Sequence, residues 1–166
     1  SGAASGCAQP QSSALAMITG RPKYNLGATD ECAARREKPI VEITARGAEG
    51  GAEGKDFQQT LATIVRCYSM RIIGPNCLGL LNTDPAVRLN ASFAPHFPPS
   101  GRVAFCSQSG ALGLAIIALA RERQLGLSNF VSVGNKADVS GNDLLQYWEE
   151  DKRTKVVRLY LESFGN

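Results

Sequence analysis

The segment that decides the fold reads SGRVAFCSQSGALG and spans Ser100 to Gly113. The apolar residues Val103 to Cys106 predict a strand, and 107–110 predict a tight loop of small residues. A helix rich in Ala, Leu and Ile then runs from Ala111 to about Arg123. A strand that passes through a short loop directly into a helix is the opening unit of an α/β sheet.

The pattern continues downstream of this segment. We expect a strand over Phe130–Val133, a helix capped by Asn142 or Asp143, and a strand over Val156–Leu161. This alternation of strands and helices predicts an α/β fold with a flavodoxin-like parallel sheet.

A second α/β unit precedes it. Ile40–Thr44 and Arg71–Ile73 are predicted strands, and Asp56–Ser69 is a predicted amphipathic helix with Phe57 and Leu61 on its apolar face. A strand–helix–strand unit implies that its two strands are parallel.

Proline-rich sequence separates the two units. We place a linker at 94–101, a first domain at 30–93 and a second domain at 102–166. Residues 1–29 are rich in Gly, Ala and Ser with weak periodicity, so we expect poor order, or one short helix around Ser13–Ile18. Asp30 would cap a short helix that runs through Arg36.

Composition narrows the function classes. The 166 residues are 43% hydrophobic and carry a net charge of +3, which is too mild to favour nucleic acid or membrane binding. The single histidine, His96, excludes a His-rich metal site, and we expect no metal. The five cysteines form no CxxC pair, so a reducing, cytoplasmic location is the simplest expectation.

The loop 107–110 is the strongest functional motif. Amides at the start of the following helix, near Ser109 and Gly110, would face the carboxyl edge of the sheet, where a phosphate would be favoured. No lysine follows at the spacing of a Walker A loop. An ordinary strand–helix turn remains an equal alternative, and a serine nucleophile is a weaker one because the leading Gly of GxSxG is missing.

Two other strand ends carry polar residues. Asn76 and Cys77 follow the strand that ends at Ile73, and Glu162 follows the last strand. Strand ends of this kind point into ligand crevices, although a plain turn and a solvated charge are the commoner roles. Cys77 has no evident partner base that would make it a nucleophile.

Five motifs together resemble a known family. They are IGPNCLGLLN (73–82), LNASFAP (89–95), SGRVAFCSQSGALG (100–113), VSVGNKADVSGNDLL (131–145) and a strand that ends in Leu161-Glu162. Their order and spacing resemble the NDP-forming acyl-CoA synthetases and the alpha subunit of succinyl-CoA synthetase.

The resemblance implies a function. Residues 30–93 would be the C-terminal part of a Rossmann-like CoA-binding domain, and 102–166 the N-terminal part of a flavodoxin-like ligase domain. Acyl-CoA, phosphate and NDP would interconvert with acid, CoA and NTP through an acyl phosphate and a phosphohistidine. The ADP or GDP would lie on an ATP-grasp subunit or fused domain outside this chain.

The resemblance also implies roles for single residues. Ser109 and Gly110 would hold the phosphate and Glu162 would orient the histidine. The strand end Ile43-Thr44-Ala45 would line the coenzyme A site, and Asn76 would lie near the point of acyl transfer.

The sequence departs from the family in three places, one of which is Arg46, where the family has a Gly after the Ile-Thr-Ala strand end. The phosphorylated histidine of the family follows a later strand, and His96 does not match it. The Gly-rich loop that holds the CoA phosphates is not recognisable. We therefore expect an internal part of a ligase that is inactive alone. The alternative is a regulatory acyl-CoA-binding module of a lysine acetyltransferase.

Overall fold

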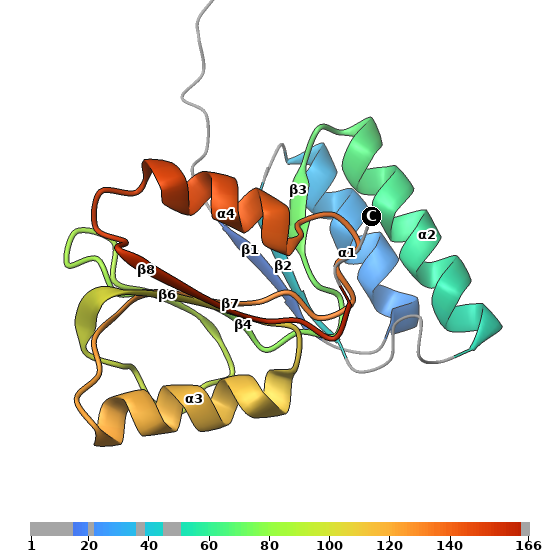
Figure 1. Ribbon diagram of the computed structural model, residues 1–166. Helices are drawn as coiled ribbons and strands as arrows, with labels where there is room; N and C mark the ends of the chain where they lie inside the picture. Colours follow the sequence, from blue (N-terminus) through green and yellow to red (C-terminus); the bar gives the residue numbers. More distant parts are fainter. Residues whose placement is uncertain (1–14, 20–21, 36–38, 45–50, 164–166) are drawn as a thin grey trace, which may run out of the picture.

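The computed structural model describes residues 15–19, 22–35, 39–44 and 51–163, which form two adjoining α/β units (Figure 1). The first unit is a parallel sheet in the order β1 (Ala16–Thr19), β2 (Pro39–Ile43) and β3 (Arg71–Ile73). Helices α1 (Pro22–Ala34) and α2 (Ala52–Cys67) pack on one face of it. The apolar face predicted for α2 is confirmed, because Phe57 and Leu61 are buried against the strands.

The second unit is a larger mixed sheet. Its order is β5 (Leu89–Ser92), β4 (Gly79–Asn82), β7 (Leu127–Ser132), β6 (Ser100–Ser107) and β8 (Val156–Tyr160). Strands β7, β6 and β8 are parallel, whereas β4 and β5 are antiparallel additions. Helices α3 (Gly110–Glu122) and α4 (Gly141–Glu150) cover opposite faces (Figure 1). The predicted α/β fold with a flavodoxin-like sheet is confirmed.

The division between the sheets lies earlier than the sequence predicted. Strands β4 and β5 pair with β7, so 79–92 belong with the second sheet and not with the first domain at 30–93. Strand β6 begins at Ser100, inside the predicted linker 94–101. Four-residue strands without a run of β-branched residues give little signal in a sequence, which is why this hairpin was missed.

The start of the chain also differs from the prediction. Where a short helix around Ser13–Ile18 was considered, β1 pairs with β2, and Ile18 is buried. Asp30 lies inside α1 and does not cap it. The weak periodicity has a physical cause, because α1 buries the polar residues Asn25 and Thr29. Asn25 Nδ2 donates to Glu42 Oε1 (3.2 Å), and Thr29 Oγ1 donates to the Asn25 carbonyl (2.9 Å).

Helix α4 begins slightly earlier than predicted. Its N-cap is Ser140 and not Asn142 or Asp143. The Asp143 carboxylate accepts hydrogen bonds from the Ser140 backbone N–H (2.9 Å) and hydroxyl (2.7 Å). Asp143 therefore stabilises the start of the helix from its first turn.

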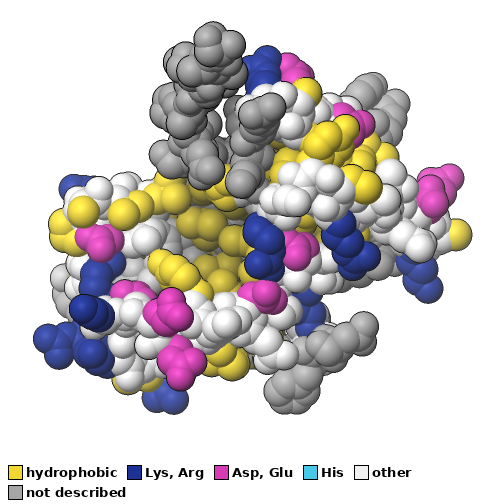
Figure 2. All heavy atoms as spheres, turned by 90° about the horizontal axis from the view of Figure 1, so that it is seen from above, with side chains coloured by type: hydrophobic (Ala, Val, Ile, Leu, Met, Phe, Trp, Pro, Cys, Tyr) yellow, Lys and Arg dark blue, Asp and Glu magenta, His cyan; other side chains and the backbone are white. Residues whose placement is uncertain are grey.

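Charges of both signs are interspersed on the face seen in Figure 2, around a hollow lined with hydrophobic side chains. No single-sign field is gathered there, in keeping with the small net charge. Over the ranges that the structure describes, no helix combines the length and apolar character that a membrane crossing needs.

Candidate functional site

The β6–α3 connection builds the first wall of the candidate site. The Ser107 hydroxyl donates to the carbonyl of Ser109 (2.7 Å), and the Ser109 hydroxyl caps α3 by accepting from Leu112 N (3.4 Å). The first amides of a helix have no partner within the helix. The Ser109 cap satisfies the amide of Leu112, whereas the amides of Gly110 and Ala111, two residues that line the cavity, have no acceptor within the helix.

Close packing of α3 on the sheet fixes where this helix start lies. A Cβ added at Gly113 would meet Cζ of Phe130 at 2.6 Å, and Phe130 is fully buried. The glycine therefore lets the first turn of α3 approach the sheet closely. Gly110 is different, because a Cβ there would make only an ordinary contact of 3.8 Å with Leu78.

The junction of the two sheets builds the second wall. The loop that follows β7 runs beside the end of β3 through three backbone hydrogen bonds, from Val139 N to Ile72 O (3.2 Å), from Ala137 N to Gly74 O (3.0 Å) and from Asn135 N to Pro75 O (2.9 Å). Gly134 makes this approach possible, since its φ is +52° and a Cβ would lie 2.3 Å from the carbonyl oxygens of Pro75 and Asn76.

Side chains strengthen the same junction. Arg71 at the start of β3 donates from Nε to Asp138 Oδ2 (2.9 Å) and from Nη2 to Asp143 Oδ1 (2.8 Å). Burial acts to raise the pKa of Asp143, but hydrogen bonds from Ser140 and Arg71 outweigh it and hold the pKa at about 2. The junction is therefore fixed by ion pairs as well as by backbone contacts.

Hydrogen bonds between side-chain amides connect the junction of the two sheets with the cavity. Asn76, with a φ of +56°, donates from Nδ2 to Asn135 Oδ1 (3.2 Å). Asn135 donates in turn to Gln58 Oε1 on α2 (3.3 Å). Asn76 and Asn135 both line the cavity, so the first unit helps to shape a site that lies mainly in the second.

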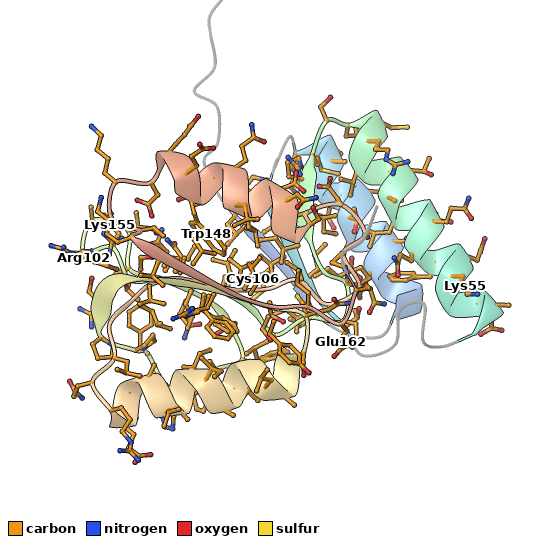
Figure 3. All side chains as sticks on the ribbon, in the orientation of Figure 1. Lys55, Arg102, Cys106, Trp148, Lys155 and Glu162 are labelled. Atoms are coloured by element: carbon orange, nitrogen blue, oxygen red, sulfur yellow. The ribbon has the colours of Figure 1, made fainter. Side chains whose placement is uncertain are left out.

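Glu162 closes the site from the third side. It is exposed and follows β8 at one end of the sheet, whereas Arg102 and Lys155 lie at the opposite end (Figure 3). The cavity encloses about 360 Å³. Its lining comprises Asn76, Cys77, Leu78, Phe93, Gln108, Ser109, Gly110, Ala111, Gly134, Asn135 and Glu162.

The structure thus brings four of the predicted site residues together: Ser109, Gly110, Asn76 and Glu162. Sequence reasoning did not single out Gln108 and Asn135, although each lies two residues after a predicted strand within a quoted motif, and it missed Phe93, which follows β5. Position after a strand in a parallel sheet is the signal that could have found the first two.

The predicted coenzyme A residues lie elsewhere. Ile43 and Thr44 are buried at the end of β2 and do not line this cavity, and Ala45 lies outside the described residues. Ile43 packs with Val41 and Cys77 on the face of the first sheet away from α1 and α2. The Thr44 hydroxyl is buried without a hydrogen-bond partner in the described part of the chain.

The nucleophile alternatives gain no support from the geometry. Burial raises the pKa of the Cys77 thiol to about 12, and this thiol donates to the carbonyl of Glu42 (3.3 Å). The Ser109 hydroxyl serves as a helix cap. The chain's single histidine, His96, contacts Arg121 (2.7 Å) in the last turn of α3, at the far end from Ser109. A serine–histidine pair is therefore not assembled.

Comparison with known proteins gives consistent matches. Residues 100–166 match the family described as the succinyl-CoA ligase like flavodoxin domain. The chain is 45% identical over 133 residues to acetate–CoA ligase [ADP-forming] of Methanocaldococcus jannaschii, covering 80% of the chain and 18% of that protein. It is 42% identical over 148 residues to the alpha subunit of acetate–CoA ligase [ADP-forming] II of Pyrococcus furiosus, covering 89% and 32%.

A solved structure agrees with these relatives. It is the dinucleotide forming acetyl-coenzyme A synthetase 1 of Ca. Korarchaeum cryptofilum in complex with phosphate and ADP, with a TM-score of 0.87 and 39% identity. The match covers 95% of this chain and 33% of that one. The chain thus spans between about a fifth and a third of the length of the proteins it matches, and it belongs to the family of NDP-forming acyl-CoA synthetases that is related to the alpha subunit of succinyl-CoA synthetase.

Proposed function

We propose that the chain supplies the phosphate-binding part of an acid–CoA ligase. The reaction would convert acyl-CoA and phosphate into acyl phosphate and CoA, transfer the phosphoryl group to a histidine with release of the acid, and pass it to NDP. The convergence of the α3 N-terminus, the Asn76–Asn135 pair and Glu162 on one cavity carries this proposal.

The start of α3 suits phosphate for electrostatic reasons. The positive end of the helix dipole lies at Gly110 and Ala111, two residues that line the cavity, and anions bind at such ends. No acidic residue lies in the first turn of α3 to compete for these amides. Ser109 would hold the helix start in place and add a hydroxyl at its rim.

Glu162 and Asn76 have separate roles in the proposal. A carboxylate beside a phosphate-carrying imidazole can accept its second ring N–H and so fix its orientation. His96 lies at the far end of α3, so the phosphoryl-carrying histidine would come from outside this sequence. Asn76, at the mouth of the junction, would lie near the carbonyl that undergoes acyl transfer.

Coenzyme A would bind at the end of β2. The unpartnered Thr44 hydroxyl fits a polar ligand there, because buried hydroxyls normally have a hydrogen-bond partner. Ile43 and Ala45 would complete that strand end. The nucleotide, ADP or GDP, would bind an ATP-grasp subunit or fused domain outside this chain. The Korarchaeum relative is described in complex with phosphate and ADP, which supports a reaction that uses both.

A chimera tests the function. The chain would replace its matching segment in the Methanocaldococcus ligase, and the purified chimera would be incubated with γ-labelled ATP. We expect acid-labile phosphohistidine and acetyl-CoA formation, both strongly reduced by Glu162→Gln and by Ser109→Ala. The unaltered relative is the positive control, and circular dichroism verifies folding. A folded chimera that takes up no label would refute the proposal.

Phosphate binding can be measured on the chain itself. Calorimetry of the 166-residue chain should show weak phosphate binding that Ser109→Ala reduces further. Ser92→Ala is a matched control, because Ser92 lies in β5 and does not line the cavity. Equal phosphate affinity in both variants would contradict the role of the α3 start.

A further inference from the structure

The turn that carries Glu162 is held by two side chains from other loops. The Gln108 side-chain carbonyl accepts hydrogen bonds from the backbone N–H groups of Glu162 (2.9 Å) and Ser163 (3.1 Å). On the other side, Lys136 Nζ donates to the carbonyl of Ser163 (2.5 Å) and to its hydroxyl (2.9 Å). Gln108 and Lys136 therefore hold the turn at Glu162 and Ser163 by hydrogen bonds to its N–H groups and to its oxygen atoms.

Each of these side chains comes from a loop that also contributes residues to the lining of the cavity. Gln108 immediately precedes Ser109, the N-cap of α3, and its own backbone N–H donates to the carbonyl of Tyr160 (2.9 Å). Lys136 lies in the loop after β7, whose neighbouring residue Ala137 bonds to Gly74 at the sheet junction. The turn after β8 is thus hydrogen-bonded both to the loop at the start of α3 and to the loop at the junction of the two sheets.

We propose that Gln108 and Lys136 are positioning residues, which hold Glu162 at a fixed place relative to the start of α3. The functional part rests on the proposed role of Glu162 as the residue that orients the histidine. Rate depends steeply on such placement, because displacements of about 1 Å can cost on the order of a hundredfold. Glu162 itself is exposed and β8 is an edge strand of the described sheet, so packing alone holds this turn weakly.

The chemistry of the two side chains fits this task. Gln108 offers an acceptor for two N–H groups without adding a negative charge beside Glu162 and the phosphate. A carboxylate at the same place would accept the same bonds but repel both anions. Lys136 adds a positive charge at the turn, which compensates part of the negative charge that the site would gather.

Two substitutions at Gln108 separate positioning from charge. Gln108→Met keeps the length of the side chain and removes the acceptor, whereas Gln108→Glu keeps an acceptor and adds charge. In the 166-residue chain, amide hydrogen exchange at Glu162 and Ser163 should accelerate about tenfold or more in the Met variant and stay slow in the Glu variant. Lys136→Met should accelerate exchange at these two amides less than Gln108→Met does, because Lys136 bonds only to oxygen atoms of Ser163.

A remote glutamine provides the matched control. Gln124 donates from Nε2 to the carbonyl of Arg121 (2.9 Å) at the far end of α3. Gln124→Met should leave exchange at Glu162 and Ser163 unchanged. If these two amides exchange at unprotected rates in the unaltered chain, or if Gln108→Met does not change them, the positioning role is wrong whatever the activity.

The chimera then gives the functional readout. Gln108→Met should lower the rate of phosphohistidine formation about tenfold to a hundredfold and leave KM for CoA unchanged. Gln108→Glu should restore most of that rate at saturating phosphate but raise KM for phosphate. An unchanged rate in a folded Gln108→Met chimera would overturn the positioning role of Gln108. Absence of label in the unaltered chimera would instead overturn the proposed function. The hydrogen-exchange result would then decide whether Gln108 holds the turn that carries Glu162.

Discussion

Glu42 makes a strong prediction about the pH dependence of stability. It lies in β2 and is fully buried, with one carboxyl oxygen accepting from Asn25 and the other without a partner in the described residues. Burial raises the pKa of this carboxyl from 4.5 to about 7, against a smaller lowering by the Asn25 hydrogen bond. The folded state therefore keeps a proton that the unfolded state loses.

The sign and size follow from these two values. Below pH 4.5 both states are protonated, so the full stability is present. As the pH rises from 4.5 to about 7, only the unfolded state ionises, and the free energy of unfolding falls. The loss amounts to about 3 kcal/mol, because each pKa unit is worth about 1.4 kcal/mol. Above the folded-state pKa, stability should no longer change on account of this group.

Glu42→Gln tests this reasoning, because a glutamine is neutral at every pH and its Oε1 can still accept from Asn25. Urea unfolding followed by circular dichroism, from pH 4.5 to 8.5, should show a variant whose advantage over the unaltered chain grows by about 3 kcal/mol across that range. Glu31→Gln is the control, since Glu31 is exposed and paired with Arg35. A difference between the Glu42 variant and the unaltered chain that stays constant with pH would refute the argument.

Three other substitutions test the packing. Gly134→Ala places a Cβ 2.3 Å from the Pro75 carbonyl oxygen at a φ of +52°, so urea unfolding should show a loss of more than about 2 kcal/mol. Gly27→Ala in α1 meets no atom within 4 Å and should instead raise the free energy of unfolding by up to about 1 kcal/mol. Arg71→Met should lower the free energy of unfolding by about 1 kcal/mol, and this loss should be smaller in 1 M salt. NMR titration of the same variant should show the pKa of Asp143 rising from about 2.

The sequence predicts which residues converge on the cavity better than it predicts where the two sheets divide. Ser109, Gly110 and Glu162 follow strands β6 and β8, and the carboxyl ends of parallel strands must meet at one edge. Once the strand–helix alternation is recognised, their convergence needs no further information. No such rule predicts the hairpin β4–β5, because four-residue antiparallel strands are stabilised by pairing with their neighbours rather than by their own composition.

The N-terminal error has a different origin. A periodicity argument assumes that a buried helix face is apolar, but α1 buries the polar residues Asn25 and Thr29, and Asn25 bonds to Glu42. A buried carboxylate partner for a helix can be recognised only when the strand beside it is known. The sequence of this strand indicates a buried polar contact, because Glu42 interrupts the β-branched run of 40–44.

The β7–α4 loop explains why the site needs both units. On one side its backbone bonds to the end of β3, and on the other side Lys136 bonds to the turn that carries Glu162. Asn135, between these contacts, links Asn76 to Gln58 on α2. A rotation of the first unit against the second would therefore strain the same loop that positions Glu162. Because the proposed CoA residues lie in the first unit and the phosphate residues in the second, this loop is the element that would fix the distance between acyl transfer and phosphoryl transfer.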